Sequence, residues 1–165
     1  MKKVFILLIS CLLLVGCSDK KEKDKKHKHK EHDKKEDDIA IVDVAILVNS
    51  IETSTSQNVI ISGITDTILS QNTSETSANV DIVAVDNSNA FSVEESIRDL
   101  FTNGNVPEVI ICLDELSTTC VYQAVIDYNV VGKVNILGYY RSDIICNAID
   151  REVINSTISV DTNQL

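Results

Sequence analysis

Positive charges and aromatic side chains are scarce beyond the first 38 residues of this sequence. The chain carries 15 Lys and Arg against 25 Asp and Glu, with a formal net charge of -10, and 4% of its residues are aromatic. Eleven of the 15 cations and eight of the 25 carboxylates precede residue 39, which leaves four cations and 17 carboxylates in residues 39–165. Because an acidic body with few stacking side chains repels a polyanion, we exclude nucleic acid as a partner.

The motifs of common catalytic sites are also missing. There is no G-x-G-x-x-G after a strand pattern, no P-loop and no G-x-S-x-G. All three histidines, His27, His29 and His32, precede residue 39, so Ser–His or Cys–His catalysis has no base in the body. Asp86 and Asp114 remain as an acid and base pair, although carboxylates at strand ends are more often binding or capping groups. We expect no enzymatic activity and no cofactor.

No C-x-x-C spacing is present, so the five cysteines do not indicate a metal site. Cys11 and Cys17 lie near the N-terminus, and an odd number remains beyond them: Cys112, Cys120 and Cys146. We predict that Cys112 and Cys120 are small, reduced core residues. A disulfide or redox role is the alternative.

The N-terminus has the pattern of a secretory signal. Met1, Lys2 and Lys3 precede an apolar run over residues 4–15 that is too short to span a bilayer. Leu14-Val15-Gly16-Cys17 resembles the lipobox of bacterial lipoproteins. The resemblance implies that residues 1–16 are removed and that the Cys17 thiol takes a diacylglyceryl group, so that several acyl chains, palmitate among them, anchor the protein on the extracytoplasmic face of the cell membrane. An ordinary signal peptide with an unrelated cysteine is the alternative.

Residues 17–38 follow as the lipidated cysteine and a charged tether. Apart from Ser18, every residue from 18 to 38 is Asp, Glu, Lys or His, with nine lysines against eight acids. Such a segment buries nothing, and we predict a disordered spacer of about 25 Å as a coil. Its histidines could hold zinc or nickel loosely, but we expect no metal because nothing fixes the ligands in a closed geometry.

Residues 39–165 alternate between strand and helix patterns. We expect strands at residues 41–48, 80–85, 108–113, 134–137 and 157–160, and four helices between them. A Ser/Thr/Asn-rich loop over residues 70–79 precedes the second strand. Ser92 is expected to open the second helix with a capping box, Ser117 to cap the third helix, and Gly138 to let the backbone turn sharply. This order predicts a doubly wound α/β lobe, a five-stranded parallel sheet with helices on both faces.

Ligands of such sheets bind beyond the carboxyl ends of the strands, and polar residues follow the strands here. They are Asn49-Ser50, Asp86-Asn87-Ser88-Asn89, Asp114-Glu115 and Tyr139-Tyr140-Arg141. Amides and carboxylates bind paired hydroxyls, and a tyrosine covers the C–H face of a sugar ring, so the set suits a polyol. Asn and Asp are also simply good turn and cap formers at these positions.

The order of elements from Val44 to the C-terminus resembles one lobe of the sugar-type periplasmic binding proteins, the ribose- and galactose-binding receptors of ABC transporters. The residues that carry the resemblance are 108–116 (EVIICLDEL), 122–126 (YQAVI), 132–139 (GKVNILGY), 148–154 (AIDREVI) and 156–161 (STISVD). It implies the C-terminal lobe of a type I periplasmic-binding-protein fold over residues 39–165. In the family, the acid at the place of Asp114 and a polar residue near Asn89 bind sugar hydroxyls. Tyr140 stands where Asp or Asn is usual, and Asn58 stands where several members carry arginine.

Two functions follow from this resemblance. The first is a membrane-anchored, carbohydrate-type solute-binding protein of an ABC transporter, abbreviated to one lobe, whose partners are a sugar or polyol and the permease or a membrane sensor. The second is a sensing or protein-interaction module that uses the same lobe without transport. Because one lobe supplies one wall of a ligand site, we expect weak sugar affinity for this chain alone. The sequence leaves open the identity of the ligand, the oligomeric state and the kind of bacterial envelope.

Overall fold

The computed structural model describes residues 39–51 and 54–159, which form a five-stranded parallel sheet with four helices. The signal, Cys17 and the tether lie outside the described residues. In chain order the elements are β1 (Ala40–Asn49), α2 (Thr55–Leu69), β2 (Thr76–Val85), α3 (Ala90–Thr102), β3 (Val109–Cys112), α4 (Glu115–Asp127), β4 (Asn135–Tyr139), α5 (Asp143–Asp150) and β5 (Ser156–Ile158). The strand order is β2-β1-β3-β4-β5, with every pair parallel.

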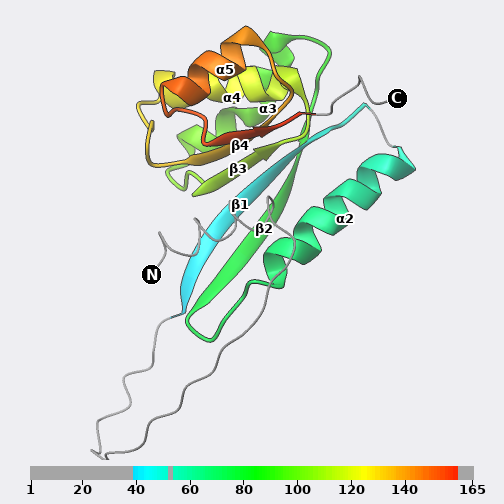
Figure 1. Cartoon of the computed structure of the whole chain (residues 1–165), viewed down its shortest axis with the longest axis vertical. Helices are drawn as coiled ribbons and strands as arrows, with labels where there is room; N and C mark the ends of the chain where they lie inside the picture. Colours follow the sequence, from blue (N-terminus) through cyan, green and yellow to red (C-terminus); the bar gives the residue numbers. More distant parts are fainter. Residues whose placement is uncertain (1–38, 52–53, 160–165) are drawn as a thin grey trace, which may run out of the picture.

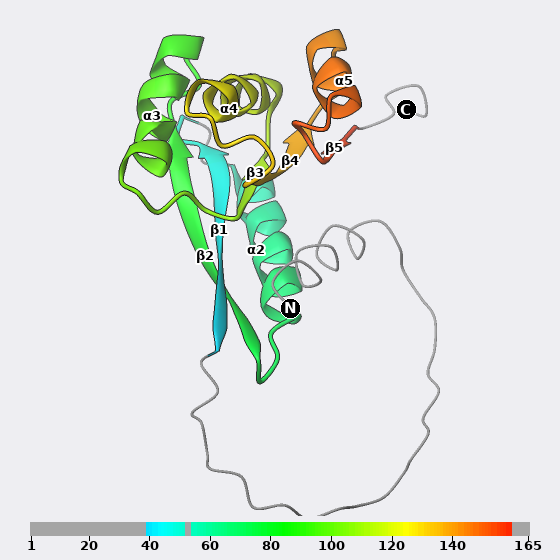
Figure 2. The same cartoon turned by 90° about the vertical axis from the view of Figure 1, so that its left-hand side faces the viewer.

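Helices cover both faces of the sheet, as predicted. Figure 1 shows α2 on one face and α3, α4 and α5 on the other. β1 and β2 pair over ten residues, whereas β1 meets β3 over four. As a result, β1 and β2 continue as a two-stranded ribbon past the rest of the sheet (Figure 2).

The core has two parts, one on each side of β1. Val42, Val44, Ile46 and Val48 point to the α2 side and belong to one buried cluster, together with Ile68 of α2. Ala45 and Leu47 belong to a second, larger cluster under α3, α4 and α5. Since successive strand residues face opposite sides, a central strand covered on both faces must be almost continuously apolar, and β1 is.

Two helices begin earlier than their serines suggested. α3 begins at Ala90 with Asn89 as its N-cap, and α4 begins at Glu115 with Asp114 as its N-cap. Ser92 and Ser117 instead donate their backbone N–H groups to those two side chains. The prediction was wrong because Asn89 and Asp114 already have the extended backbone that an N-cap needs, and each has a side-chain oxygen for the capping hydrogen bond.

The edge strand β2 is longer than predicted. It begins at Thr76, inside the stretch expected to be a loop, and Thr76 to Asn79 pair with Ala40 to Asp43 of β1. Ala78 is buried against the α2 face, and its polar neighbours Ser77 and Asn79 point the other way. A strand with one solvated face tolerates polar residues at alternate positions, which hid this segment from the apolar pattern.

Candidate functional site

The parallel topology brings the polar strand ends to one edge of the sheet. Asn49 ends β1, the loop of residues 86–89 follows β2, Asp114 follows β3 shortly after its end, and Tyr140 follows β4 directly. β3 and β4 are adjacent in the sheet, so Asp114 and Tyr140 follow strands that lie about 4.8 Å apart. The loop after β2 lies two strands from β3. We call this set of strand ends the carboxyl edge.

Asp114 is held in place by the first turn of α4. Its Oδ1 accepts a hydrogen bond from the backbone N–H of Ser117 at 2.7 Å, and its Oδ2 accepts one from the Ser117 hydroxyl, also at 2.7 Å. Ser117 is fully buried. The carboxylate is therefore a capping group whose orientation is fixed, and each oxygen keeps a lone pair for a further donor.

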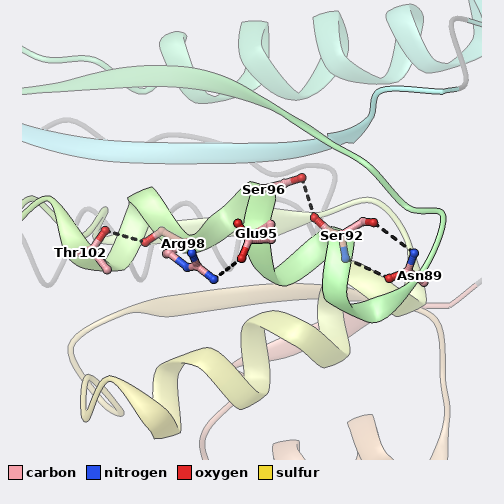
Figure 3. A network of polar contacts seen from close by, with 6 residues as sticks. All are labelled: Asn89, Ser92, Glu95, Ser96, Arg98 and Thr102. Atoms are coloured by element: carbon pink, nitrogen blue, oxygen red, sulfur yellow. Dashed lines mark hydrogen bonds and ion pairs between the residues drawn. The ribbon is translucent and has the colours of Figure 1, made fainter.

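Asn89 has a similar capping role at α3 (Figure 3). Its Oδ1 accepts from the N–H of Ser92 at 3.1 Å, and its Nδ2 donates to the hydroxyls of Ser88 and Ser92. Both amide hydrogens therefore have acceptors, in Ser88 of the loop and Ser92 of α3, and Oδ1 keeps acceptor capacity for a ligand hydroxyl.

Tyr140 has an unusual backbone conformation. Its φ of 80° lies in the left-handed region, and its side chain is 51% exposed. The N–H donates to the carbonyl of Ile158 at 2.7 Å, and the carbonyl accepts from the Thr157 hydroxyl at 2.7 Å. The other two non-glycine residues with positive φ in the described ranges follow helix ends, where this conformation is common. At Tyr140 the left-handed backbone conformation occurs directly after a strand, in a residue with an exposed aromatic ring. Strained conformations of this kind are typical of functional positions.

Thr118 joins α4 to the end of β4. Its hydroxyl donates to the carbonyl of Asp114 at 2.7 Å and accepts from the N–H of Tyr139 at 3.0 Å. The sharp turn falls at Tyr140 and not at Gly138, which lies inside β4 and corrects the prediction. Gly138 is needed for close approach, because a Cβ there would lie 2.7 Å from Cγ2 of Thr118. These contacts fix Asp114 relative to Tyr139 and its neighbour Tyr140.

Asp86 is a turn residue of the loop after β2. Its Oδ1 accepts from the N–H of Ser88 at 2.9 Å. That bond and a contact with the Ser88 hydroxyl lower the pKa of the Asp86 carboxyl. Desolvation opposes the shift, and the Ser92 hydroxyl adds a smaller lowering. Asp86 and Asp114 thus both accept local hydrogen bonds as turn and cap groups, the interpretation that the sequence favoured over acid and base catalysis.

Asn58 lies in a different part of the molecule's surface. It is exposed in α2 and lines a groove of about 560 Å³ between α2 and the strands β1 and β2, together with Asn49 and Gln57. Gln57 Nε2 donates to the carbonyl of Asn49 at 3.2 Å. Asn58 is therefore grouped with the end of β1, whereas Asp114, Asn89 and Tyr140 do not line this groove.

Phe91 is a candidate site residue that was not predicted from the sequence. This residue lies in the first turn of α3, two positions after Asn89, and its side chain is 68% exposed. The buried residues of α3 are Val93, Ile97 and Phe101, so Phe91 points away from that stripe. An aromatic residue that breaks the inward pattern beside a strand-end loop was the available signal, and it adds a second ring to the carboxyl edge.

Cys112 and Cys120 lie in the core, as predicted. Both are buried free thiols, and Cys146 is partly buried and also free. Burial, followed by the charge of Asp114, raises the pKa of Cys112 far above its usual value. Burial, followed by the charges of Glu94 and Asp114, raises the pKa of Cys120 to about 11. Neither thiol has the lowered pKa of a reactive cysteine.

Residues 39–51 and 54–159 contain no cluster of three or more His, Cys, Asp or Glu that could bind a metal ion. In the same ranges, no helix combines the length and the apolar character needed to cross a membrane. The histidines of the tether lie outside both ranges.

Comparison with known proteins gives structural matches. No protein-family model and no curated protein matches the sequence. XylFII, solved in the XylFII–LytSN complex, is 20% identical with a TM-score of 0.61, over 76% of this chain and 44% of that chain. GanP, a glucose-galactose binding protein from Geobacillus stearothermophilus, is 14% identical with a TM-score of 0.60, over 72% and 40%. A carbohydrate transporter solute-binding protein from Agrobacterium radiobacter, solved with D-arabinose, is 18% identical with a TM-score of 0.61, over 73% and 39%.

These matches define the architecture of the described residues. The chain spans less than half the length of the three neighbours, and at these identities the likeness concerns the fold. The strand order, the parallel pairing and the helices on both faces agree with it. The described residues therefore have the fold of one lobe of a type I periplasmic binding protein.

Proposed function

We propose that this chain is a membrane-anchored, carbohydrate-type solute-binding protein of an ABC transporter, and that its carboxyl edge forms one wall of the sugar site. The fold supports this proposal, because its structural neighbours include proteins that bind glucose, galactose and D-arabinose. No group in the proposed wall is assigned a catalytic role.

One observation carries the proposal. Asp114 and Tyr140 follow adjacent parallel strands, and the hydroxyl of Thr118 joins their backbones through Asp114 and Tyr139. A fixed carboxylate beside an exposed ring is the pairing that a sugar needs, since its hydroxyls take the acceptor and its C–H face takes the ring. Phe91 and Asn89 extend the same edge toward β2.

The described residues supply a single wall. A small ligand is usually enclosed over about 70% or more of its surface, so we expect weak sugar affinity for this chain alone. A second wall would come from another polypeptide or from a longer form of this protein.

Calorimetric titration of D-arabinose, D-galactose and D-glucose into the full chain tests the proposal. Asp114→Asn keeps an N-cap oxygen for the N–H of Ser117 but removes the charge, so it should weaken binding about tenfold while the melting temperature changes little. Tyr140→Ala should weaken binding by a similar factor. Val131→Ala, at an exposed apolar residue before β4, is the control and should bind as the parent does. Equal binding by all three variants would contradict the proposed site.

Membrane attachment rests on the N-terminal sequence. We propose that Cys17 carries the lipid and that the lobe lies on the extracytoplasmic face of the membrane, joined to it by residues 18–38. Mass spectrometry of the mature chain should find acyl groups on residue 17, and Cys17→Ser should release the protein from the membrane fraction. A Cys17→Ser protein that stays fully membrane-bound would exclude this anchor.

A sensing or protein-interaction module is the second candidate. It is favoured by XylFII, which was solved in a complex with a second protein, LytSN. If the full chain binds no sugar in the titration but binds a membrane sensor or permease in a pull-down from its own membranes, this second function is preferred.

A further inference from the structure

We propose that the outer edge of β2, from Val80 to Ala84, is a docking site for an extended segment of a partner protein whose side chains alternate between apolar and basic. This inference concerns the outer edge of β2, whose groove borders the carboxyl edge at Asn49, and it does not depend on sugar binding.

The direction of the backbone groups in β2 follows from its pairing with β1. The N–H of Ala40 donates to the carbonyl of Glu75 at 2.9 Å, and the N–H of Ser50 donates to the carbonyl of Val85 at 2.8 Å. Odd-numbered residues of β2 therefore turn their backbone groups toward β1. Because backbone groups alternate along a strand, the even-numbered residues turn theirs to the outside.

Side chains of the same molecule cap this outer edge at both ends. Near its start, the N–H of Ala78 donates to Oδ1 of Asn72 at 2.8 Å. Just beyond its end, the N–H of Asp86 donates to the hydroxyl of Ser96 at 3.2 Å. Between these caps, the outward N–H and carbonyl groups of Val80, Ile82 and Ala84 have no hydrogen-bond partner in the part of the chain that the structure describes.

An open edge of this kind is a template for a further strand. Natural edge strands are usually protected by lysine, proline or a bulge, and residues 80–84 contain neither lysine nor proline. The main chain of an added strand would satisfy the three outward donors and acceptors, which is the mode of peptide recognition called β-augmentation.

The α2 side of this edge is apolar. Ile82 and Ala84 line the groove of about 560 Å³ between α2 and β2, with Ile61 of α2 also in its lining. Ile82 is 56% exposed. An added strand places every second side chain on this side, and apolar side chains would cover Ile82 and fill the groove.

The opposite side of the edge is acidic. Asp81 is exposed there, and it lines a hollow of about 210 Å³ together with Asp43 and Asn79. Asn79 Nδ2 donates to Oδ1 of Asp43 at 3.0 Å, and no Lys or Arg lines the hollow. The remaining side chains of an added strand would meet these carboxylates, so charge complementarity requires Lys or Arg at those positions.

The same charges argue against a second copy of this chain as the occupant. Antiparallel pairing of two β2 edges around Ile82 would bring the two Asp81 carboxylates close on one face, with no cation between them. A basic, apolar segment from another protein removes this repulsion.

A synthetic peptide tests the proposal directly. The probe is a fluorescein-labelled nonapeptide of alternating lysine and valine, titrated with the full chain and followed by fluorescence anisotropy. Two peptides serve as controls: one of the same composition with its lysines and valines in blocks, and one of alternating glutamate and valine. We expect saturable binding of the alternating lysine peptide, weakened by salt, and at least about tenfold weaker binding of both controls.

Variants of the edge separate backbone pairing from side-chain contact. Ile82→Pro removes an outward N–H that β1 does not use, and an edge strand tolerates proline there. Its matched control, Ile82→Ala, loses the side chain but keeps the N–H. Ile82→Pro should bind the lysine peptide about tenfold more weakly than Ile82→Ala does, because a hydrogen bond is lost and the ring blocks approach.

Asp81→Lys decides the outcome if Ile82→Pro does not fold. It should lose the lysine peptide and gain affinity for the glutamate peptide. Equal binding of the peptide by Ile82→Pro and Ile82→Ala, absence of binding to the parent chain, or an Asp81→Lys protein with unchanged preference would each overturn the proposal. Sedimentation that shows a dimer of the parent chain, dissolved by Ile82→Pro, would instead assign the edge to a second copy.

Discussion

Cγ2 of Thr118 lies 2.7 Å from the point where a β-carbon on Gly138 would stand. Thr118 is fully buried, and its hydroxyl is hydrogen-bonded to the backbones of both Asp114 and Tyr139. The first turn of α4 can approach β4 this closely because residue 138 has no side chain.

Gly138→Ala is therefore expected to lower the free energy of unfolding by about 2 kcal/mol, since the new methyl group overpacks a site that cannot relax. Urea denaturation measures the change. The double variant Gly138→Ala, Thr118→Ser removes Cγ2 but keeps the hydroxyl, and it should be more stable than Gly138→Ala alone. Equal stability of the single and double variants would show that another contact causes the loss.

Tyr140 gives a prediction that separates strain from binding. Tyr140→Gly and Tyr140→Ala both remove the ring, but glycine adopts a φ of 80° without a steric penalty. The glycine variant should be more stable than the alanine variant by about 1 kcal/mol in thermal or urea unfolding. Both variants should lose sugar binding equally. A glycine variant less stable than the alanine variant would mean that the left-handed conformation is not maintained in solution.

The Asp86 carboxyl is expected to account for part of the loss of folding stability at low pH. Hydrogen bonds from Ser88 lower its pKa in the folded state, below the value of about 3.9 in an unfolded chain. The stabilisation is therefore present above about pH 4 and is lost as the pH falls through the folded pKa. Asp86→Asn should flatten the dependence of stability on pH below about pH 4. Asp99→Asn, at an exposed carboxylate of α3, is the control, and an identical effect of the two variants would contradict the assignment.

The Cys120 thiol is expected to be alkylated slowly in the folded protein. Burial raises its pKa to about 11, so little thiolate is present near neutral pH, and the thiolate is the reactive form. Iodoacetamide at pH 8 should leave Cys120 unmodified in the folded chain and modify it in urea, as peptide mass mapping would show. Cys146, which is partly buried, is the internal comparison. Rapid modification of Cys120 in the folded chain would indicate that α3 and α4 separate often.

The apolar runs were enough to predict the order of the elements. β1 and β3 are buried on both faces, and their sequences are nearly continuous runs of apolar residues, so the fold class followed from them. The edge strand β2 was found only in part, because one of its faces is solvated and its first residues are polar. A sequence pattern reports burial, and an edge strand has little of it.

The candidate site was predictable as a place and less so as a set of interactions. The polar residues after the strands identified the carboxyl edge, since parallel strands end on one side. Their partners depend on contacts between distant segments. The closeness of Thr118 to Gly138 and the turn at Tyr140 arise from residues about twenty positions apart, so local rules assigned the turn to the glycine.

The two buried thiols carry a consequence for biogenesis if the chain is exported. Disulfides form readily outside the cytoplasm, and in an unfolded chain Cys112, Cys120 and Cys146 would be open to oxidation and to mixed bonds with other proteins. Once folded, the protein shields Cys112 and Cys120 by its own packing. During maturation, folding then competes with oxidation of the exposed thiols. A variant that folds slowly would form cross-linked aggregates even when its native state is stable.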